Sequence, residues 1–145
     1  MKAVVTGASG ALGSRTCRGL ADAGATVIAV DLDRADLVST FRGADVVVHL
    51  AQTVTPEAST IDDGAQDLEV AQRVLDAASQ AGVRHAVVLS SAVVYGAWEN
   101  NPVPLTEDAP IRPNPDFAFA VHLAELERRA LDWRADNPAS SLTIL

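Results

Sequence analysis

Short apolar runs alternate with amphipathic stretches along this 145-residue chain. Runs rich in Val, Ile and Ala are typical of buried parallel strands, whereas apolar residues repeated every three to four positions predict helices that pack on a sheet. The pattern predicts five strands, at residues 2–6, 25–30, 45–50, 84–89 and 142–145. It also predicts helices at 12–23, 65–80 and 116–136, a short helix within 32–42, and loops at 52–64 and 98–115.

The alternation of strands with helices predicts the fold class. Parallel strands need long crossover connections, and right-handed crossovers place helices on both faces of the sheet. We therefore expect an α/β fold with a doubly wound parallel sheet, formed by one domain over residues 1–145. Because ligands bind such sheets at the carboxyl ends of the strands, the first candidates for a site are Thr6, Asp31, Ala51, Ser90 and Ser91.

Composition narrows the classes of partner. The chain carries a net charge of -8, which repels the phosphates of nucleic acids and of anionic lipids. The N-terminus has neither the apolar core of a signal peptide nor a run that could span a membrane, so we expect a cytoplasmic protein that binds neither nucleic acid nor membranes. Cys17 is the only cysteine, and no histidine stands at ligand spacing beside the acidic loop residues, so we expect no metal site.

Three motifs follow or end predicted strands. They are GASGALG at residues 7–13, DVVVHLA at residues 45–51 and SSAVVYG at residues 90–96. Together they resemble the NAD-dependent epimerase/dehydratase family of extended short-chain dehydrogenases/reductases, and the resemblance covers almost the whole chain. It implies a Rossmann-like sheet that binds a nicotinamide dinucleotide and a small-molecule substrate.

In this family the glycines let the backbone approach the cofactor's pyrophosphate, which lies on the N-terminus of the first helix. The resemblance therefore implies NAD(P) binding by Gly7, Ser9, Gly10, Ala11, Leu12, Gly13, Leu50 and Ala51. Asp31 ends the second strand, where a carboxylate accepts hydrogen bonds from the adenosine ribose and repels a 2′-phosphate, which favours NAD over NADP. The alternatives are a glycine turn kept only for packing and a solvated carboxylate at Asp31.

Two departures from the family concern length. The segment between Asp31 and Asp45 has no room for the family's helix, strand and second helix, so we expect a sheet without one edge strand, in the family order 2-1-4-5-6. The second strand then becomes an exposed edge. The family also continues beyond Leu145 into a C-terminal substrate domain, which has no counterpart here.

The third departure concerns catalysis. The family's tyrosine exchanges a proton with the substrate, while its lysine lowers the pKa of the phenol and holds the ribose. Phe119 and Leu123 occupy these two positions and can do neither. Tyr95 and Lys2 are the chain's only tyrosine and lysine, and Lys2 begins the first strand at the opposite end of the sheet.

Three residues remain as catalytic candidates. Ser91 matches the family serine that hydrogen-bonds the substrate oxygen, although a strand-end serine can also cap a turn. Tyr95 either lines the same cleft or packs within its turn. His122 either faces the cleft as a general base or faces solvent, and a register shifted by one residue would place it with Ala118 at the family positions.

The last two long helices, at residues 65–80 and 116–136, correspond to the family's dimer interface, which implies a homodimer or a heterodimer with a full-length relative. Their apolar stripes would also serve a helix that packs on its own sheet. The charged residues Glu125, Glu127, Arg128 and Arg129 predict the solvent face of the last helix.

Three functions follow from these observations. The favoured one is an atypical family member that binds NAD(P) or a small organic ligand, has lost ordinary redox catalysis, and performs any remaining chemistry as a cyclase, isomerase or lyase in a bacterial biosynthetic pathway. The alternative is a non-catalytic, dinucleotide-responsive regulator or an accessory subunit of a full-length relative. Ordinary epimerase or reductase activity is the least favoured, because losing a catalytic acid–base group costs about 10²–10⁴-fold in rate.

Overall fold

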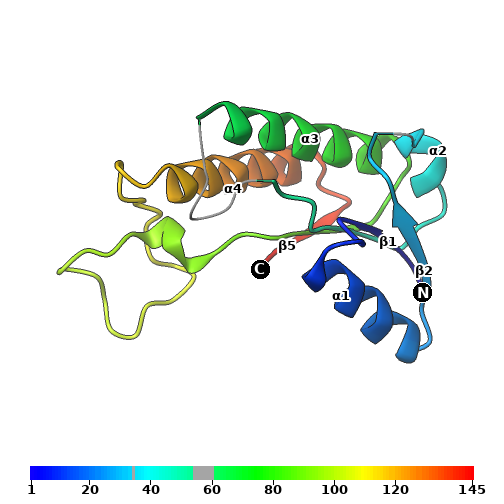
Figure 1. Ribbon diagram of the computed structural model, residues 1–145, viewed down its shortest axis with the longest axis horizontal. Helices are drawn as coiled ribbons and strands as arrows, with labels where there is room; N and C mark the ends of the chain where they lie inside the picture. Colours follow the sequence, from blue (N-terminus) through cyan, green and yellow to red (C-terminus); the bar gives the residue numbers. More distant parts are fainter. Residues whose placement is uncertain (34, 54–60) are drawn as a thin grey trace.

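The computed structural model describes residues 1–33, 35–53 and 61–145, and contains a five-stranded parallel sheet (Figure 1). The strands are β1 (Lys2–Thr6), β2 (Thr26–Val30), β3 (Val46–His49), β4 (His85–Val88) and β5 (Ser141–Ile144). Their order is β2-β1-β3-β4-β5, and every neighbouring pair is parallel. This is the order 2-1-4-5-6 of the family's numbering, so the predicted fold class and the missing edge strand are confirmed.

Helices cover both faces of the sheet. They are α1 (Ala11–Asp22), α2 (Leu37–Phe41), α3 (Ile61–Gln80) and α4 (Ala118–Asp136), with a 3₁₀ turn, η1 (Ala92–Tyr95), after β4. Figure 1 shows α3 and α4 side by side on one face together with α2, whereas α1 lies alone on the other.

The sequence of the buried strands explains why both faces are covered. Side chains of a strand alternate between the two faces of its sheet. In β1, Val4 belongs to the core beneath α2, α3 and α4, while Ala3 and Val5 belong to the core against α1. All three side chains are fully buried, because β1 lies between β2 and β3 within the sheet.

One helix prediction needs correction. Helix α3 begins at Ile61 rather than at residue 65, so the predicted loop ends four residues earlier. A glycine favours a loop when only the sequence is known, but Gly64 lies inside the helix. An added Cβ there would stand only 3.0 Å from Nδ1 of His122 on α4, which favours glycine at this position. Helix α2 agrees with the predicted short helix within 32–42. Asp36 caps it, accepting a hydrogen bond from the Ser39 backbone N–H at 3.2 Å.

The apolar stripes of α3 and α4 pack against their own sheet. Six apolar residues of these stripes are almost completely buried in the core, namely Ala71, Leu75, Ala78, Leu123, Leu126 and Ala130. These stripes therefore serve the core and give no evidence of a dimer. None of the helices in the described part of the chain is long and apolar enough to cross a membrane. The cytoplasmic location stays a prediction.

Candidate nucleotide site

The glycine turn between β1 and α1 brings three backbones together. Gly7 has a positive φ of 69°, and a Cβ there would stand 2.7 Å from the Leu50 carbonyl carbon and the Ala51 nitrogen. A Cβ on Gly13 would stand 2.0 Å from the Gly7 carbonyl oxygen. Both glycines are therefore required for packing of the turn against β3 and α1, whatever the turn binds.

Gly10 differs from the other two glycines of the motif. It is exposed, and its nearest obstacle to a Cβ is the Gly7 carbonyl oxygen at 3.4 Å. It is also the N-cap of α1, where no side chain caps the helix. Because the first N–H groups of a helix have no partner within it, the backbone at Ala11, Leu12 and Gly13 presents unpaired donors and the positive end of the helix dipole. Such a terminus binds an anion.

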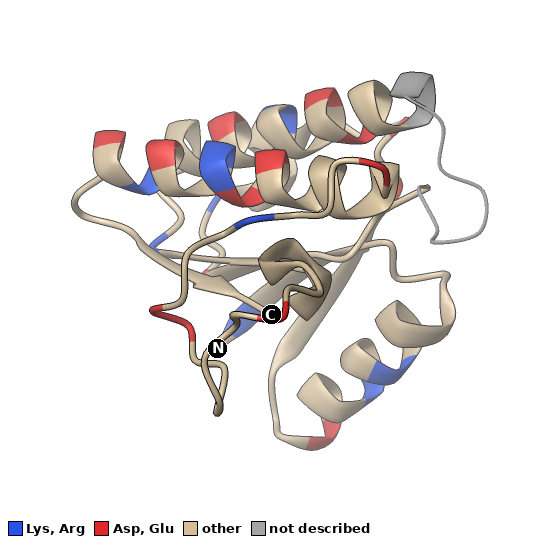
Figure 2. Ribbon diagram, turned by 90° about the vertical axis from the view of Figure 1, so that its left-hand side faces the viewer, with Lys and Arg blue, Asp and Glu red and all other residues tan. Residues whose placement is uncertain are grey.

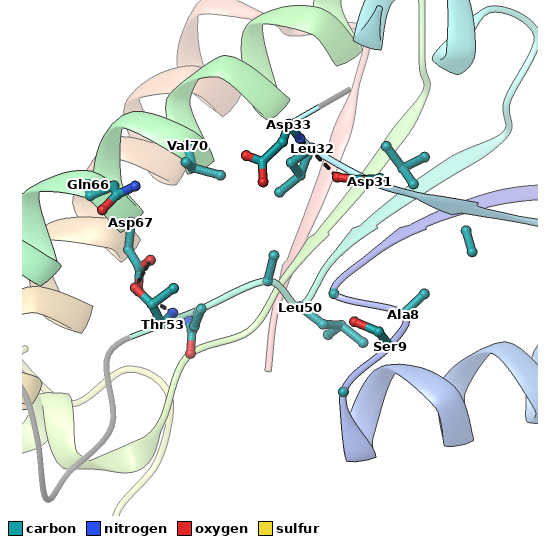
Figure 3. A pocket seen from close by; sticks show the side chains of 16 residues that line it. Ala8, Ser9, Asp31, Leu32, Asp33, Leu50, Thr53, Gln66, Asp67 and Val70 are labelled. Atoms are coloured by element: carbon teal, nitrogen blue, oxygen red, sulfur yellow. Dashed lines mark hydrogen bonds between the residues drawn. The ribbon is translucent and has the colours of Figure 1, made fainter. Parts of the chain in front are cut away.

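A cavity of about 820 Å³ opens beside this helix terminus (Figure 3). Its lining comes from four segments: residues 7–10 of the glycine turn, residues 29–33 at the end of β2, residues 50–53 after β3, and Gln66, Asp67 and Val70 of α3. The predicted cofactor residues Gly7, Ser9, Gly10, Asp31, Leu50 and Ala51 are all part of it. Ala11, Leu12 and Gly13 begin α1 and lie outside the lining.

Carboxylates mark the β2 side of the cavity. Asp31 follows β2, and its Oδ1 accepts a hydrogen bond from the Asp33 backbone N–H at 3.1 Å (Figure 3). Asp33 lies on the same side of the cavity. The lining that the structure describes contains no lysine or arginine. A bound anion can interact with the helix terminus, with the glycine-turn backbone and with neutral polar side chains such as Ser9, and it must stay clear of Asp31 and Asp33.

A buried polar group fixes the end of β3. Thr6 Oγ1 and His49 Nδ1 are 2.7 Å apart, and both side chains are buried. Burial lowers the pKa of His49 to about 4, with the charge of Asp67 acting in the opposite direction, so His49 is neutral at pH 7. The Ala51 N–H also approaches Thr6 Oγ1, at 3.4 Å. These contacts hold the β3 end against the glycine turn.

Asp67 is a site residue that the sequence analysis missed. Its carboxylate accepts hydrogen bonds from the Thr53 backbone N–H at 2.8 Å and from Thr53 Oγ1 at 2.6 Å, so it holds the segment after β3 against α3. The spacing from Asp67 to Ala71, Val74 and Ala78 places this carboxylate on the buried stripe of α3. A carboxylate on an apolar stripe is the sequence feature that could have identified it.

Ser90 and Ser91 follow β4 but face different groups. The Ser90 hydroxyl donates to Glu127 Oε1 on α4, and Glu127 is only 8% exposed. The prediction that Glu127 lies on the solvent face is therefore wrong, because Glu127 stands one turn after Leu123 on the sheet-facing stripe. Ser91 caps η1, accepting from the Val93 N–H at 3.5 Å, as the capping alternative predicted.

Tyr95 ends η1 and packs, half-buried, against the core beneath α4. Burial raises the pKa of its phenol, and the negative charges of Glu127, Glu107 and Asp108 raise it further. Neither Tyr95 nor Ser91 belongs to the lining of the large cavity. The packed position favours the interpretation of Tyr95 as a turn residue.

His122 lies between α3 and α4. It is 8% exposed, and within the described residues neither ring nitrogen has a hydrogen-bond partner. The solvent-facing alternative is therefore wrong, and His122 does not line the large cavity either. It borders a smaller cavity of about 370 Å³ with Leu68, Ala118 and Val121. Burial lowers its pKa, Arg129 adds to that effect, and Asp67 acts in the opposite direction.

The positions of the family's tyrosine and lysine are filled by core packing. Leu123 has no exposed surface and belongs to the main core. Phe119 is half-buried, and its ring centroid lies 5.8 Å from that of Phe117. The described residues include no group of three or more His, Cys, Asp or Glu side chains placed to hold a metal ion.

Comparison with known proteins supports the resemblance to the epimerase/dehydratase family. The sequence profile of the NAD dependent epimerase/dehydratase family matches residues 3–145. Among curated proteins, no match to this chain was found.

Solved structures share the fold. The structure of MoeE5 in complex with UDP-glucose and NAD is 28% identical with a TM-score of 0.80, and the match covers 99% of this chain and 52% of that one. A short-chain dehydrogenase/reductase superfamily protein from Agrobacterium tumefaciens with bound NAD is 28% identical with a TM-score of 0.78, covering 99% and 48%.

A third structure, DesIV (dTDP-glucose 4,6-dehydratase) from Streptomyces venezuelae, is 22% identical with a TM-score of 0.82, covering 99% and 55%, and shows the fold alone. The chain thus spans about half the length of these structures. The family profile, the glycine turn and the strand order lead to one conclusion: this chain belongs to the NAD-dependent epimerase/dehydratase family.

Proposed function

We propose that residues 1–145 act as one NAD(P)-binding Rossmann-like domain that binds NAD in preference to NADP and has lost ordinary redox catalysis. The observation that carries the proposal is the uncapped N-terminus of α1, which opens beside the 820 Å³ cavity with Asp31 on its β2 side. A terminus of this kind suits a pyrophosphate, and a carboxylate at the end of β2 suits a ribose with both hydroxyls free.

The residues fit the cofactor in three places. The N–H groups at Ala11, Leu12 and Gly13 would meet the pyrophosphate, and Ser9 and Gly10 leave the approach open. Asp31 would accept hydrogen bonds from the adenosine ribose, and Leu50 and Ala51 would border the cofactor from the β3 side. The MoeE5 and Agrobacterium structures contain NAD, which supports the same choice of cofactor.

Loss of redox catalysis follows from Phe119 and Leu123. Bound NAD supplies hydride transfer, but hydride transfer to or from a carbinol also needs a group that moves the hydroxyl proton. A phenyl ring and a fully buried leucine cannot move it. The reaction that remains for this chain is therefore non-redox cyclisation, isomerisation or elimination of a small organic substrate. Ser91 would hydrogen-bond the substrate, and Tyr95 and His122 are the other candidate catalytic residues.

A non-catalytic role is the second candidate. The burial of His122 between α3 and α4 favours it, because that imidazole cannot reach a substrate in the large cavity without movement of a helix. The chain would then act as a dinucleotide-responsive regulator or as an accessory subunit of a full-length relative. If the Ser91→Ala and His122→Ala variants both keep the turnover rate of the unmodified protein, neither residue takes part in catalysis.

Nucleotide titration during thermal unfolding tests the proposal. A ligand at 100 times its Kd stabilises the folded state by about 2.7 kcal/mol, so NAD should raise the unfolding temperature by several degrees. NADP should raise it less at equal concentration, and Asp31→Ser should narrow that difference. Asp22→Ser, at the end of α1 and away from the cavity, is the matched control. Equal stabilisation by NADP and NAD in the unmodified protein would contradict the assigned preference.

We also propose that α3 and α4 form an interface with a second copy or with a full-length relative. Val121 and Leu131 are 42% and 51% exposed on α4, and the 370 Å³ apolar cavity lies between the two helices. Acidic and basic residues are interspersed along α4 (Figure 2), which suits contacts between opposite charges across an interface. Arg73 is the only basic residue of α3. Sedimentation velocity should give a dimer that Val121→Glu dissociates, whereas Val103→Glu, on the exposed loop, should leave it intact.

A further inference from the structure

We infer that this chain recognises only the adenosine diphosphate half of the dinucleotide, so that ADP-ribose binds as tightly as NAD and the oxidation state of the nicotinamide does not affect affinity. The inference rests on the proposed function and specifies which part of the ligand the site requires. Three features of the structure carry it: the position of the cavity, the chemistry of its walls, and the packing at the positions that face the nicotinamide in the family.

The described lining of the cavity lies along one half of the carboxyl edge of the sheet. Its walls come from the glycine turn, the end of β2, the segment after β3 and α3 (Figure 3). Ser91, Phe119 and Leu123, which correspond to the reacting end of the family's site, are not among the lining residues. The cavity therefore continues from the helix terminus toward Asp31 and α3, which is the adenosine direction.

The walls of this cavity provide what an adenosine diphosphate needs. Leu32 at the end of β2 and Val70 on α3 give apolar surface for the faces of a flat base. The amide of Gln66, exposed on α3, can pair with the polar edge of the base. Asp31 serves the ribose, and the α1 terminus serves the diphosphate without any arginine or lysine among the described lining residues.

Among the described residues, the three positions that correspond to the reacting end of the family's site offer no comparable contacts. Leu123 is completely buried in the core, so no side chain at that position can hold a second ribose. Phe119 packs against the core and against the ring of Phe117. Ser91 accepts from the Val93 N–H to cap η1. Without a hydrogen-bond donor for the second ribose at Phe119 and Leu123, the nicotinamide nucleotide adds bulk to the ligand but contributes little affinity.

Calorimetric titration of the full chain with four ligands tests the inference. NAD, NADH and ADP-ribose should bind with Kd values within about threefold of one another, and nicotinamide mononucleotide should neither bind nor displace NAD at about 100 times the Kd of NAD. Gln66→Ala should weaken NAD and ADP-ribose equally, by about 2–10-fold, as expected for one lost hydrogen bond. Glu69→Ala, exposed on the same helix, should leave both affinities unchanged.

The outcomes separate the two proposals. ADP-ribose that binds more than about tenfold more weakly than NAD would overturn the inference while leaving NAD binding intact. Displacement of NAD by nicotinamide mononucleotide would overturn it in the same way. Failure of all four ligands to bind would overturn the proposed function together with the inference. Because Gln66 and Glu69 are exposed, their variants should fold, and unligated unfolding temperatures equal to that of the unmodified protein verify this.

Discussion

Glu127 is a buried carboxylate that interacts with two residues after the end of β4, Ser90 and Tyr95. A carboxylate in the midst of a charged run predicts a solvent-facing position, yet the helix period places Glu127 on the stripe that contains Leu123 and Ala130. There it accepts the hydrogen bond of Ser90 and acts on the phenol of Tyr95. Sequence analysis missed this role because the charges of Arg128 and Arg129 favoured the solvent-face interpretation over the period.

The titration of Tyr95 tests that arrangement directly, because it is the only tyrosine of the chain. Its phenol should ionise above its ordinary pKa of 10.0, since burial and neighbouring carboxylates disfavour the phenolate. Glu127→Gln keeps a hydrogen-bond acceptor for Ser90 and removes the charge, so the pKa of Tyr95 should fall toward its ordinary value. Ultraviolet absorbance of the phenolate between pH 8 and 12 would measure the change.

A matched carboxylate on the same helix provides the control. Glu125 interacts with Arg128 and Arg129, which lower its pKa to about 2, and it is not among the groups that act on Tyr95. Glu125→Gln should therefore leave the tyrosine titration unchanged. The same titration curve in Glu127→Gln and the unmodified protein would contradict the arrangement.

At the scale of elements, the strands could be predicted because buried parallel strands have long apolar runs and turn residues at both ends. Their order was implied by the resemblance to the family. The start of α3 could not be predicted, because Gly64 favours a loop in the sequence and its close approach to His122 of α4 joins residues that are distant in sequence. The position of His122 was missed for the same reason. Contacts between helices that are distant in sequence leave little trace in the local pattern of either one.

The glycine turn gives an element-scale prediction with a control in the same helix. In Gly13→Ala the new methyl group would stand 2.0 Å from the Gly7 carbonyl oxygen, so α1 must shift away from the turn. We expect destabilisation of about 1–3 kcal/mol, as for other overpacked sites, and weaker NAD binding. Urea denaturation measures the first effect and the calorimetric Kd the second.

Gly19→Ala tests the same substitution where space is available. Nothing lies within 4 Å of a Cβ at Gly19, which is also in α1. Alanine has the higher helix propensity, so this variant should be more stable by about 0.5–1 kcal/mol and bind NAD normally. If the two variants changed stability in the same direction, helix propensity rather than the close approach to Gly7 would govern α1.

At the scale of the whole molecule, the free energy of unfolding depends on pH because a histidine is buried in its neutral form within the sheet. His49 is buried beside Thr6, and its pKa of about 4 lies well below its ordinary 6.5. The unfolded chain therefore binds a proton at His49 before the folded one does. The stability that this histidine contributes is fully present above pH 6.5 and is lost as the pH falls toward 4. His122, whose pKa burial also lowers, acts in the same direction.

Acid should therefore weaken the protein before its carboxylates protonate. The pKa values of Asp36, Asp45 and Glu125 are lowered from 3.8, 3.8 and 4.5, so their contribution falls only below about pH 4.5. Between pH 7 and pH 5 the loss belongs to the histidines, and His49 alone should cost about 2 kcal/mol at pH 5. Urea midpoints measured at pH 7, 6 and 5 should decrease in order. The His49→Asn variant should be less stable at pH 7, but its urea midpoint should decrease less between pH 7 and pH 5. A midpoint of the unmodified protein that is independent of pH over this range would contradict the prediction, because it would show that His49 is protonated without cost in the folded sheet.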